Sequence, residues 1–179
     1  SKRALMGKAL LEGADVAIFT SDNPRSEKAD AILVQMTLGL DIAEPSAVIE
    51  DRSDAIRAAV IAQCDAVGEN YAQEVLAKVA EAHIDLPVHF IGAIQSNKVR
   101  QLAPYISLWQ GVDRLSAISE IGKRAPGAEI LLQVNTTNED TKSGVAPAEV
   151  ESLLAAGQDA GLVVRGLMTI GPTSGDIAE

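Results

Sequence analysis

The sequence predicts an α/β protein built from repeated strand–helix units whose strands run parallel. Short runs that are wholly apolar alternate with longer amphipathic runs, as expected for parallel strands that helices cover. Hydrophobic residues make up 47% of the 179 residues but aromatic residues only 3%, which suits a core of Ala, Val, Ile and Leu. The predicted strands cover residues 16–20, 47–49, 88–91, 106–110, 130–135 and 163–170, with a weaker candidate at 66–68.

Three apolar stripes at helical spacing predict helices between the later strands. The stripes consist of Val75, Leu76, Val79 and Ala80, then Leu115, Ile118 and Ile121, and then Val150, Leu153 and Leu154. Pro147 precedes the last stripe, where the first turn of a helix tolerates proline. Repeated strand–helix units form a parallel sheet, either open or closed into a barrel. We therefore expect helices after the strands that end at Ile91, Gln110 and Asn135.

The composition argues against several classes of function. A formal charge of −10 disfavours nucleic acids and anionic membranes as partners, because both attract clustered Lys and Arg, and it suits a soluble cytoplasmic protein. The single cysteine, Cys64, cannot form an internal disulfide, and His83 and His89 are too few and too separated for a zinc site. No apolar run reaches membrane-spanning length, and no signal peptide follows Ser1. The chain starts without Met and ends without a tail, as a fragment would.

Polar residues gather where the predicted strands pass into helices, and parallel α/β proteins bind ligands at such junctions. The first junction carries Asn70, whose amide can both donate and accept hydrogen bonds. The others lie at residues 89–98, 133–144 and 166–170. A structural interpretation competes at each junction. Glycine permits tight turns, Ser96 or Asn97 can cap a helix, and an isolated histidine such as His89 more often serves the structure than catalysis.

Four segments together resemble consecutive signatures of the pyridoxal-phosphate homeostasis protein family: GENYAQE at 68–74, HFIGAIQSNK at 89–98, QVNTTNEDTKSG at 133–144 and GLMTI at 166–170. The resemblance covers residues 64–179. It implies a partial TIM barrel akin to the N-terminal barrel of alanine racemase, with pyridoxal 5′-phosphate held at the carboxyl ends of the strands. The family binds the cofactor and passes it on without a defined catalytic turnover. The cofactor-binding residues that the resemblance implies here are Asn70, His89, Asn135 and Met168.

The chain departs from that family at two places. The family's first strand ends in a lysine that bonds covalently to the cofactor, whereas residues 56–63 contain no lysine. The family's last two strands, which supply the phosphate cradle, would follow Glu179, and such a barrel needs about 250 residues. Lys142 is therefore the candidate for residual covalent capture, although Glu139 and Asp140 favour its charged, unreactive ammonium. We predict weak, non-stoichiometric labelling of this lysine.

Residues 1–63 resemble a different family, the C-terminal domain of the Mur ligases, and in particular those that add diaminopimelate to the peptidoglycan precursor. The matching segments are residues 2–7, 14–16, 20–25, 51–52 and 55–56. In these ligases the DNPR segment helps to recognise the incoming amino acid, so the resemblance implies substrate-binding roles for Asn23 and Arg25. Alternatively, these residues form an ordinary strand-to-helix turn. The motif G-x-x-x-x-G-K-[ST] is missing, so ligase chemistry is not expected.

We interpret the chain as a chimera of a Rossmann-like Mur ligase segment at residues 1–63 and five barrel units at residues 64–179. Three hypotheses about its function remain open: a module that binds pyridoxal phosphate, an amino-acid-recognition domain of a ligase, and a folded scaffold without a ligand. No catalytic activity is expected, and the partner in the first two hypotheses is a small molecule. The unpaired strand edges of an unfinished barrel predict self-association.

Overall fold

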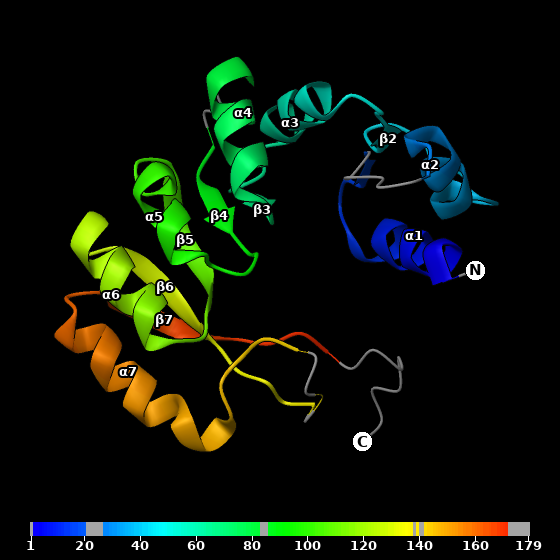
Figure 1. Ribbon diagram of the computed structural model, residues 1–179. Coiled ribbons are helices and arrows are strands. Elements are labelled where there is room, and N and C mark those ends of the chain that lie inside the picture. The colour runs from blue at the N-terminus through cyan, green and yellow to red at the C-terminus, as the bar shows by residue number, and fades with distance from the viewer. Residues whose placement is uncertain (1, 21–26, 83–85, 138, 140–141, 172–179) are drawn as a thin grey trace. The chain divides into compact units, whose positions relative to one another are not determined.

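The chain folds as two compact units, which Figure 1 shows as a ribbon. The structure is a computed structural model that describes residues 2–20, 27–82, 86–137, 139 and 142–171. Unit 1 contains the N-terminal residues up to Asp65, and unit 2 begins at Ala66. In the part of the chain that the structure describes, no helix combines the length and the apolar character needed to cross a membrane.

The described residues of unit 1 form three helices and a two-stranded parallel sheet. Its elements are α1 (Lys2–Gly13), β1 (Ile18–Phe19), α2 (Ala29–Thr37), β2 (Ala47–Val48) and α3 (Arg52–Ile61). The core is small: Ala17, Phe19 and Leu33 are buried, and four partly buried residues, Leu11, Met36, Leu40 and Ile42, pack against them. The Asp51 side chain caps α3, because its carboxylate accepts a hydrogen bond of 3.0 Å from the backbone amide of Asp54.

Unit 2 consists of a five-stranded sheet and the helices that connect its strands. Its elements are β3 (Val67–Glu69), α4 (Ala72–Ala82), β4 (Val88–Phe90), α5 (Ser96–Leu102), β5 (Ile106–Val112), α6 (Leu115–Arg124), β6 (Glu129–Gln133), the 3₁₀ helix η1 (Pro147–Glu149), α7 (Val150–Asp159) and β7 (Val163–Met168). The strands that the sequence predicts in this unit are all present, including the weaker candidate, which forms β3. The helices follow the expected strands.

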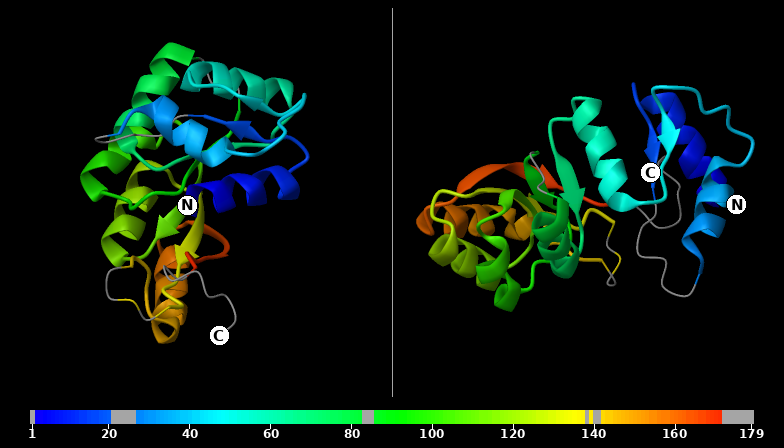
Figure 2. Two further views of the ribbon diagram at one scale, coloured as in Figure 1. Left: turned by 90° about the vertical axis from the view of Figure 1, so that its right-hand side faces the viewer. Right: turned by 90° about the horizontal axis from the view of Figure 1, so that it is seen from above.

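The strand order of unit 2 distinguishes a barrel-like sheet from a doubly wound one. The order is β3-β4-β5-β6-β7, and every neighbouring pair is parallel. Crossovers between parallel strands are right-handed, so an order that never reverses places all connecting helices on the same face. A doubly wound sheet reverses its order and is covered on both faces. In Figures 1 and 2 the helices α4, α5, α6 and α7 follow one another along one face. The parallel α/β prediction is confirmed.

The core of unit 2 lies between the sheet and this layer of helices. Phe90 and Trp109 are buried neighbours in the register and meet edge to face with ring centroids 6.0 Å apart. A Cβ atom on Gly157 of α7 would lie 3.6 Å from the Ile130 side chain, so Ile130 of β6 also faces the helices. Because side chains alternate along a strand, His89 between Val88 and Phe90 points to the opposite face.

Candidate functional site

The carboxyl ends of the five parallel strands bring together most of the residues that the sequence singles out. Asn70 directly follows β3, Met168 is the last residue of β7, and Asn135 follows β6 after Val134. The backbone amide of Val134 donates a hydrogen bond of 2.9 Å to the carbonyl of Met168, so the ends of β6 and β7 are joined. The sheet thus places Asn70, Asn135 and Met168 at its carboxyl edge.

His89 lies inside β4 rather than after it. His89 pairs with Leu108 of β5, which in turn pairs with Glu129, the first residue of β6. Met168, in contrast, pairs with Gln133, the last residue of β6. His89 is therefore nearer to the amino end of the sheet than Met168 is. The His89 Nδ1 atom is 3.1 Å from Gln110 Nε2. An amide nitrogen can only donate, so Nδ1 accepts and the ring proton sits on Nε2. His89 therefore offers a donor on the face away from the helices.

An ion pair lies on the strands beside this histidine. The Arg165 guanidinium of β7 donates a hydrogen bond to the Glu129 carboxylate, which lowers the pKa of that carboxyl below its ordinary value. Partial desolvation of the carboxylate opposes this effect, and the positive charge of Arg165 adds to it. The same hydrogen bond raises the pKa of Arg165. Glu129 is thus held in its ionised form.

Asn135 uses both ends of its amide within its own loop. Its Nδ2 donates to the carbonyl of Glu139 at 3.0 Å, and its Oδ1 accepts from the backbone amide and the hydroxyl of Thr137, each at 3.1 Å. The backbone amide of Asn135 donates to the carbonyl of Val145 at 2.9 Å. These contacts fit the structural role of asparagine in turns, so Asn135 shapes the loop between β6 and η1.

Lys142 is held by two partners and does not project freely from its loop. Its Nζ lies 3.0 Å from Glu139 Oε1 and donates a hydrogen bond to the carbonyl of Gly171, which follows β7. Its side chain is only 14% exposed. Glu139, which the sequence predicts to favour the charged form of Lys142, therefore contacts it directly. Asp140 lies outside the described residues. Lys142 ties the loop after β6 to the segment after β7.

Two glycines allow the backbone to pack closely at the same edge. A Cβ atom on Gly92 would lie 2.0 Å from the carbonyl oxygen of Asn70, and one on Gly111 would lie 2.5 Å from the carbonyl oxygen of Gly92. Real Cβ atoms do not approach backbone atoms this closely. Any side chain at these positions would push the strand ends apart, so the geometry around Asn70 depends on both glycines.

Two pockets open near the strand ends. The first, of about 160 Å³, lies where β3 and β4 pass into α4 and α5, and Asn70, Gln95 and Lys98 line it. The second, of about 450 Å³, lies between the start of α6 and the start of α7 and contains Arg114. The Arg114 guanidinium pairs with Asp113 at 2.6 Å and donates to the carbonyl of Ile94. Amide, ammonium and guanidinium groups suit a polar, anionic ligand.

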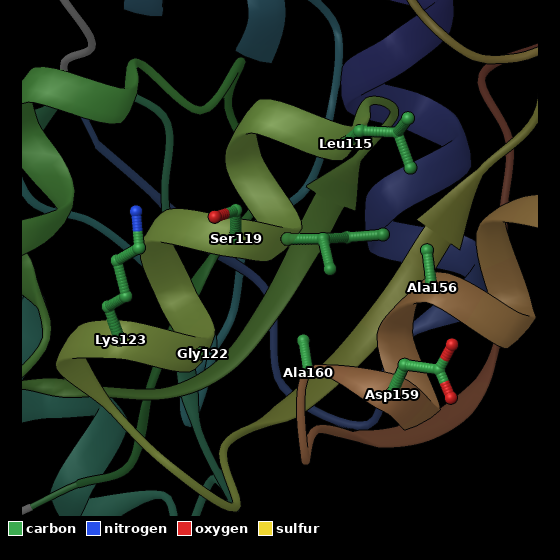
Figure 3. A pocket seen from close by; sticks show the side chains of 8 residues that line it. Leu115, Ser119, Gly122, Lys123, Ala156, Asp159 and Ala160 are labelled. Carbon is green, nitrogen blue, oxygen red and sulfur yellow. The ribbon is translucent and has the colours of Figure 1, made fainter.

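A third and larger pocket of about 530 Å³ is a groove between α6 and α7 (Figure 3). Leu115, Ala156 and Ala160 line it together with the polar side chains of Lys123 and Asp159. Its lining comes from helices alone and includes none of the residues at the strand ends that the sequence predicts.

Sequence reasoning missed a buried ion pair next to Asn70. Glu69, the last residue of β3, is 3% exposed and accepts a hydrogen bond from the ammonium of Lys78 in α4. The only signal in the sequence is the spacing of Glu74 and Lys78, four residues apart on the predicted helix.

Asn23 and Arg25, proposed from the Mur ligase resemblance, lie outside the described residues. Among the described residues, no group of three or more His, Cys, Asp or Glu is arranged to hold a metal ion.

The fold is similar to that of known parallel α/β structures. The structure of PipY from Synechococcus elongatus with the cofactor bound superimposes with a TM-score of 0.64 at 24% identity, covering 96% of this chain and 71% of that one. Alanine racemase from Clostridium difficile superimposes with a TM-score of 0.58 at 14% identity, covering 68% of this chain and 32% of the racemase. These likenesses concern the fold.

The sequence is similar to particular curated proteins as well. The chain is 42% identical over 123 residues to the pyridoxal phosphate homeostasis protein of Pseudomonas aeruginosa, a match that covers 65% of this chain and 53% of that protein. The chain spans about half the length of the curated relatives it matches. No protein-family model matches it. These similarities support the resemblance to the homeostasis family, while the resemblance of residues 1–63 to Mur ligases stays a prediction.

Proposed function

We propose that the chain binds pyridoxal 5′-phosphate reversibly at the carboxyl ends of β3–β7 and passes it on without catalysing a reaction. The observation that carries the proposal is that Asn70 and Met168 both lie at the carboxyl edge of the parallel sheet. These residues come from segments that resemble the homeostasis family, and ligands of parallel βα folds bind at this edge. When bound, the cofactor would supply an aldehyde group that acceptor enzymes use in their own chemistry.

Two lysines of unit 2, Lys78 and Lys142, are held in a way that disfavours covalent capture, and a third, Lys98, suits hydrogen-bonded capture. The ammonium of Lys142 is held by Glu139 and Gly171, and that of Lys78 is buried against Glu69. A charged ammonium has no free electron pair with which to attack an aldehyde. Lys98 lines the 160 Å³ pocket and has no ion-pair partner among the described residues. Its ammonium suits a phosphate group, and the nearby Asn70 amide can donate as well.

Titration with pyridoxal phosphate tests this proposal. We expect a change in the absorbance of the cofactor that dialysis reverses, and sub-stoichiometric labelling after borohydride reduction. Asn70→Ala should weaken binding about tenfold, because it removes a hydrogen-bonding group at the edge. Asn97→Ala is the matched control: Asn97 is exposed in α5 and does not line the pocket. A parent chain that leaves the absorbance unchanged, or equal loss in both variants, would refute the proposal.

We propose a second function for unit 1, recognition of a diamino acid by Asn23 and Arg25, in the manner of the Mur ligase domains that it resembles. Its support is the DNPR segment together with the fact that unit 1 is compact by itself. A guanidinium can hold a carboxylate through two parallel hydrogen bonds. Calorimetric titration with diaminopimelate should show binding that Arg25→Ala removes and Arg57→Ala retains. Absence of binding to the parent chain would end this proposal.

We also propose that the chain self-associates. β3 and β7 are the outermost strands of the described sheet, and exposed strand edges pair with other chains. Sedimentation velocity should show a dimer or larger species whose fraction rises with protein concentration; a monomer at all concentrations would contradict this.

A further inference from the structure

The buried charges beside Asn70 form a cluster of three side chains. The Nζ atom of Lys78 in α4 donates to a carboxylate oxygen of Glu69 in β3 and also lies 3.2 Å from Oε2 of Glu74 in the first turn of α4. The side chains of Glu69, Lys78 and Glu74 are 3%, 11% and 21% exposed. One lysine thus connects the last residue of β3 to both the start and the middle of α4.

Stability alone gives no reason for these charges. Removing charged groups from water costs free energy, and well-packed apolar side chains of similar volume often replace a buried ion pair without loss. A charged hydrogen bond, in contrast, constrains direction as well as distance. Strand β3 contains only three residues and pairs on one side, with β4. At its carboxyl end the backbone amide of Ile91 donates to the Glu69 carbonyl at 2.9 Å, and the hydrogen bond from Lys78 adds a restraint through the Glu69 side chain.

The residues that follow Glu69 form one wall of the 160 Å³ pocket. Asn70 and Tyr71 connect β3 to α4, and both line that pocket together with Ala72 and Gln73 at the start of the helix. The backbone of Asn70 is also packed against Gly92, where no Cβ would fit. Any shift of Glu69 relative to α4 would therefore move the Asn70 amide at the proposed binding edge.

We propose that Lys78 is a positioning residue: by holding Glu69 and Glu74 together, it sets the turn that presents Asn70 to the ligand. This inference rests on the proposed binding of pyridoxal phosphate for its functional consequence. It assigns a role to a lysine that does not line the 160 Å³ pocket. The role differs from simple stabilisation, because an apolar pair could restore stability but would not restore the direction of the turn.

Two variants separate these roles. Lys78→Met leaves Glu69 buried without this cation, and Glu69→Leu/Lys78→Met replaces the pair by apolar side chains of similar size. Lys8→Met is the matched control, because Lys8 also faces a glutamate four residues away on a helix, at 3.7 Å, but its side chain is 60% exposed. For each protein we would measure the melting temperature, the dissociation constant for pyridoxal phosphate, and hydrogen exchange of the amides of residues 70–73.

The proposal predicts that the double variant regains the melting temperature of the parent but still binds pyridoxal phosphate about tenfold more weakly, with faster exchange at residues 70–73. Recovery of stability, binding and protection together would overturn it, since the pair would then be structural only. If the parent does not bind the cofactor, the proposed function fails, and hydrogen exchange decides the positioning role alone. Unchanged protection at residues 70–73 in the double variant would then refute that role.

Discussion

Units 1 and 2 have the same kind of strand–helix pattern in their sequence but differ in how much core the pattern builds. In unit 2, Trp109, Phe90 and Ile130 are each at most 2% exposed between a five-stranded sheet and its helices. In unit 1 the sheet has two strands, and Leu5 and Leu38 are each 71% exposed. Alternation of apolar and amphipathic runs thus predicts where strands and helices form. The stability of a unit depends on how many of these strands and helices pack against one another.

The largest effect is expected in the core of unit 2. Trp109→Ala should lower the free energy of unfolding by about 3–5 kcal/mol, because it leaves a cavity in a packed interior. The indole Nε1 is buried without a hydrogen-bond partner in the structure, so Trp109→Phe, which removes that donor and keeps a ring, should cost less than about 2 kcal/mol. Urea denaturation followed by circular dichroism measures both. Equal losses would mean that the indole is not packed as described.

A smaller core in unit 1 should make its unfolding separable. Phe19→Ala removes the largest buried side chain of unit 1 and should unfold this unit first. The only tryptophan of the chain is in unit 2, so its fluorescence reports on that unit alone, while circular dichroism reports on both. We expect the variant to lose helical signal at low urea and to keep the parent's fluorescence transition. A joint shift of both transitions would show that the units unfold together.

In each unit an exposed arginine–glutamate ion pair should respond to acid. Hydrogen bonds from Arg3 and from Arg165 lower the pKa values of Glu27 and Glu129 below the ordinary 4.5. A depressed folded-state pKa gives stability that is present above the ordinary pKa and is lost as the pH falls through the folded-state value. Both units should therefore weaken slightly as the pH falls below the ordinary carboxyl pKa of 4.5. Arg165→Met should reduce this slope for the tryptophan transition and Arg3→Met should not; the reverse result would contradict the assignment.

The smallest effect is expected at Lys142. Peptide mapping after borohydride trapping with pyridoxal phosphate should find Lys142 labelled no more than Lys123, which is exposed, because Glu139 and Gly171 hold its ammonium. Lys142→Gln should leave the reversible absorbance change in place. Stoichiometric labelling of Lys142 alone would show that its contacts open readily and that covalent capture survives in this chain.

Local patterns in the sequence predict most elements of the fold and the sheet edge at which polar residues gather. Apolar periodicity is a local property, so it located β4, β5, β6 and β7 and the helices between them within a few residues. It missed the end of β5, where the four residues from Trp109 to Val112 lie opposite the three residues from Ile130 to Leu132 in a bulge. Such an irregularity depends on the neighbouring strand and leaves no periodic signal.

The contacts of the polar side chains, in contrast, could not be predicted from the sequence. Asn135 and Lys142 have the residue types of a binding site, yet their contacts close loops. The register sets His89 level with Leu108, and Glu69 meets Lys78 because α4 folds back on β3. The physical reason is that a hydrogen bond requires two partners within about 3 Å, and segments far apart in the sequence reach that distance only when the sheet and its crossovers have formed.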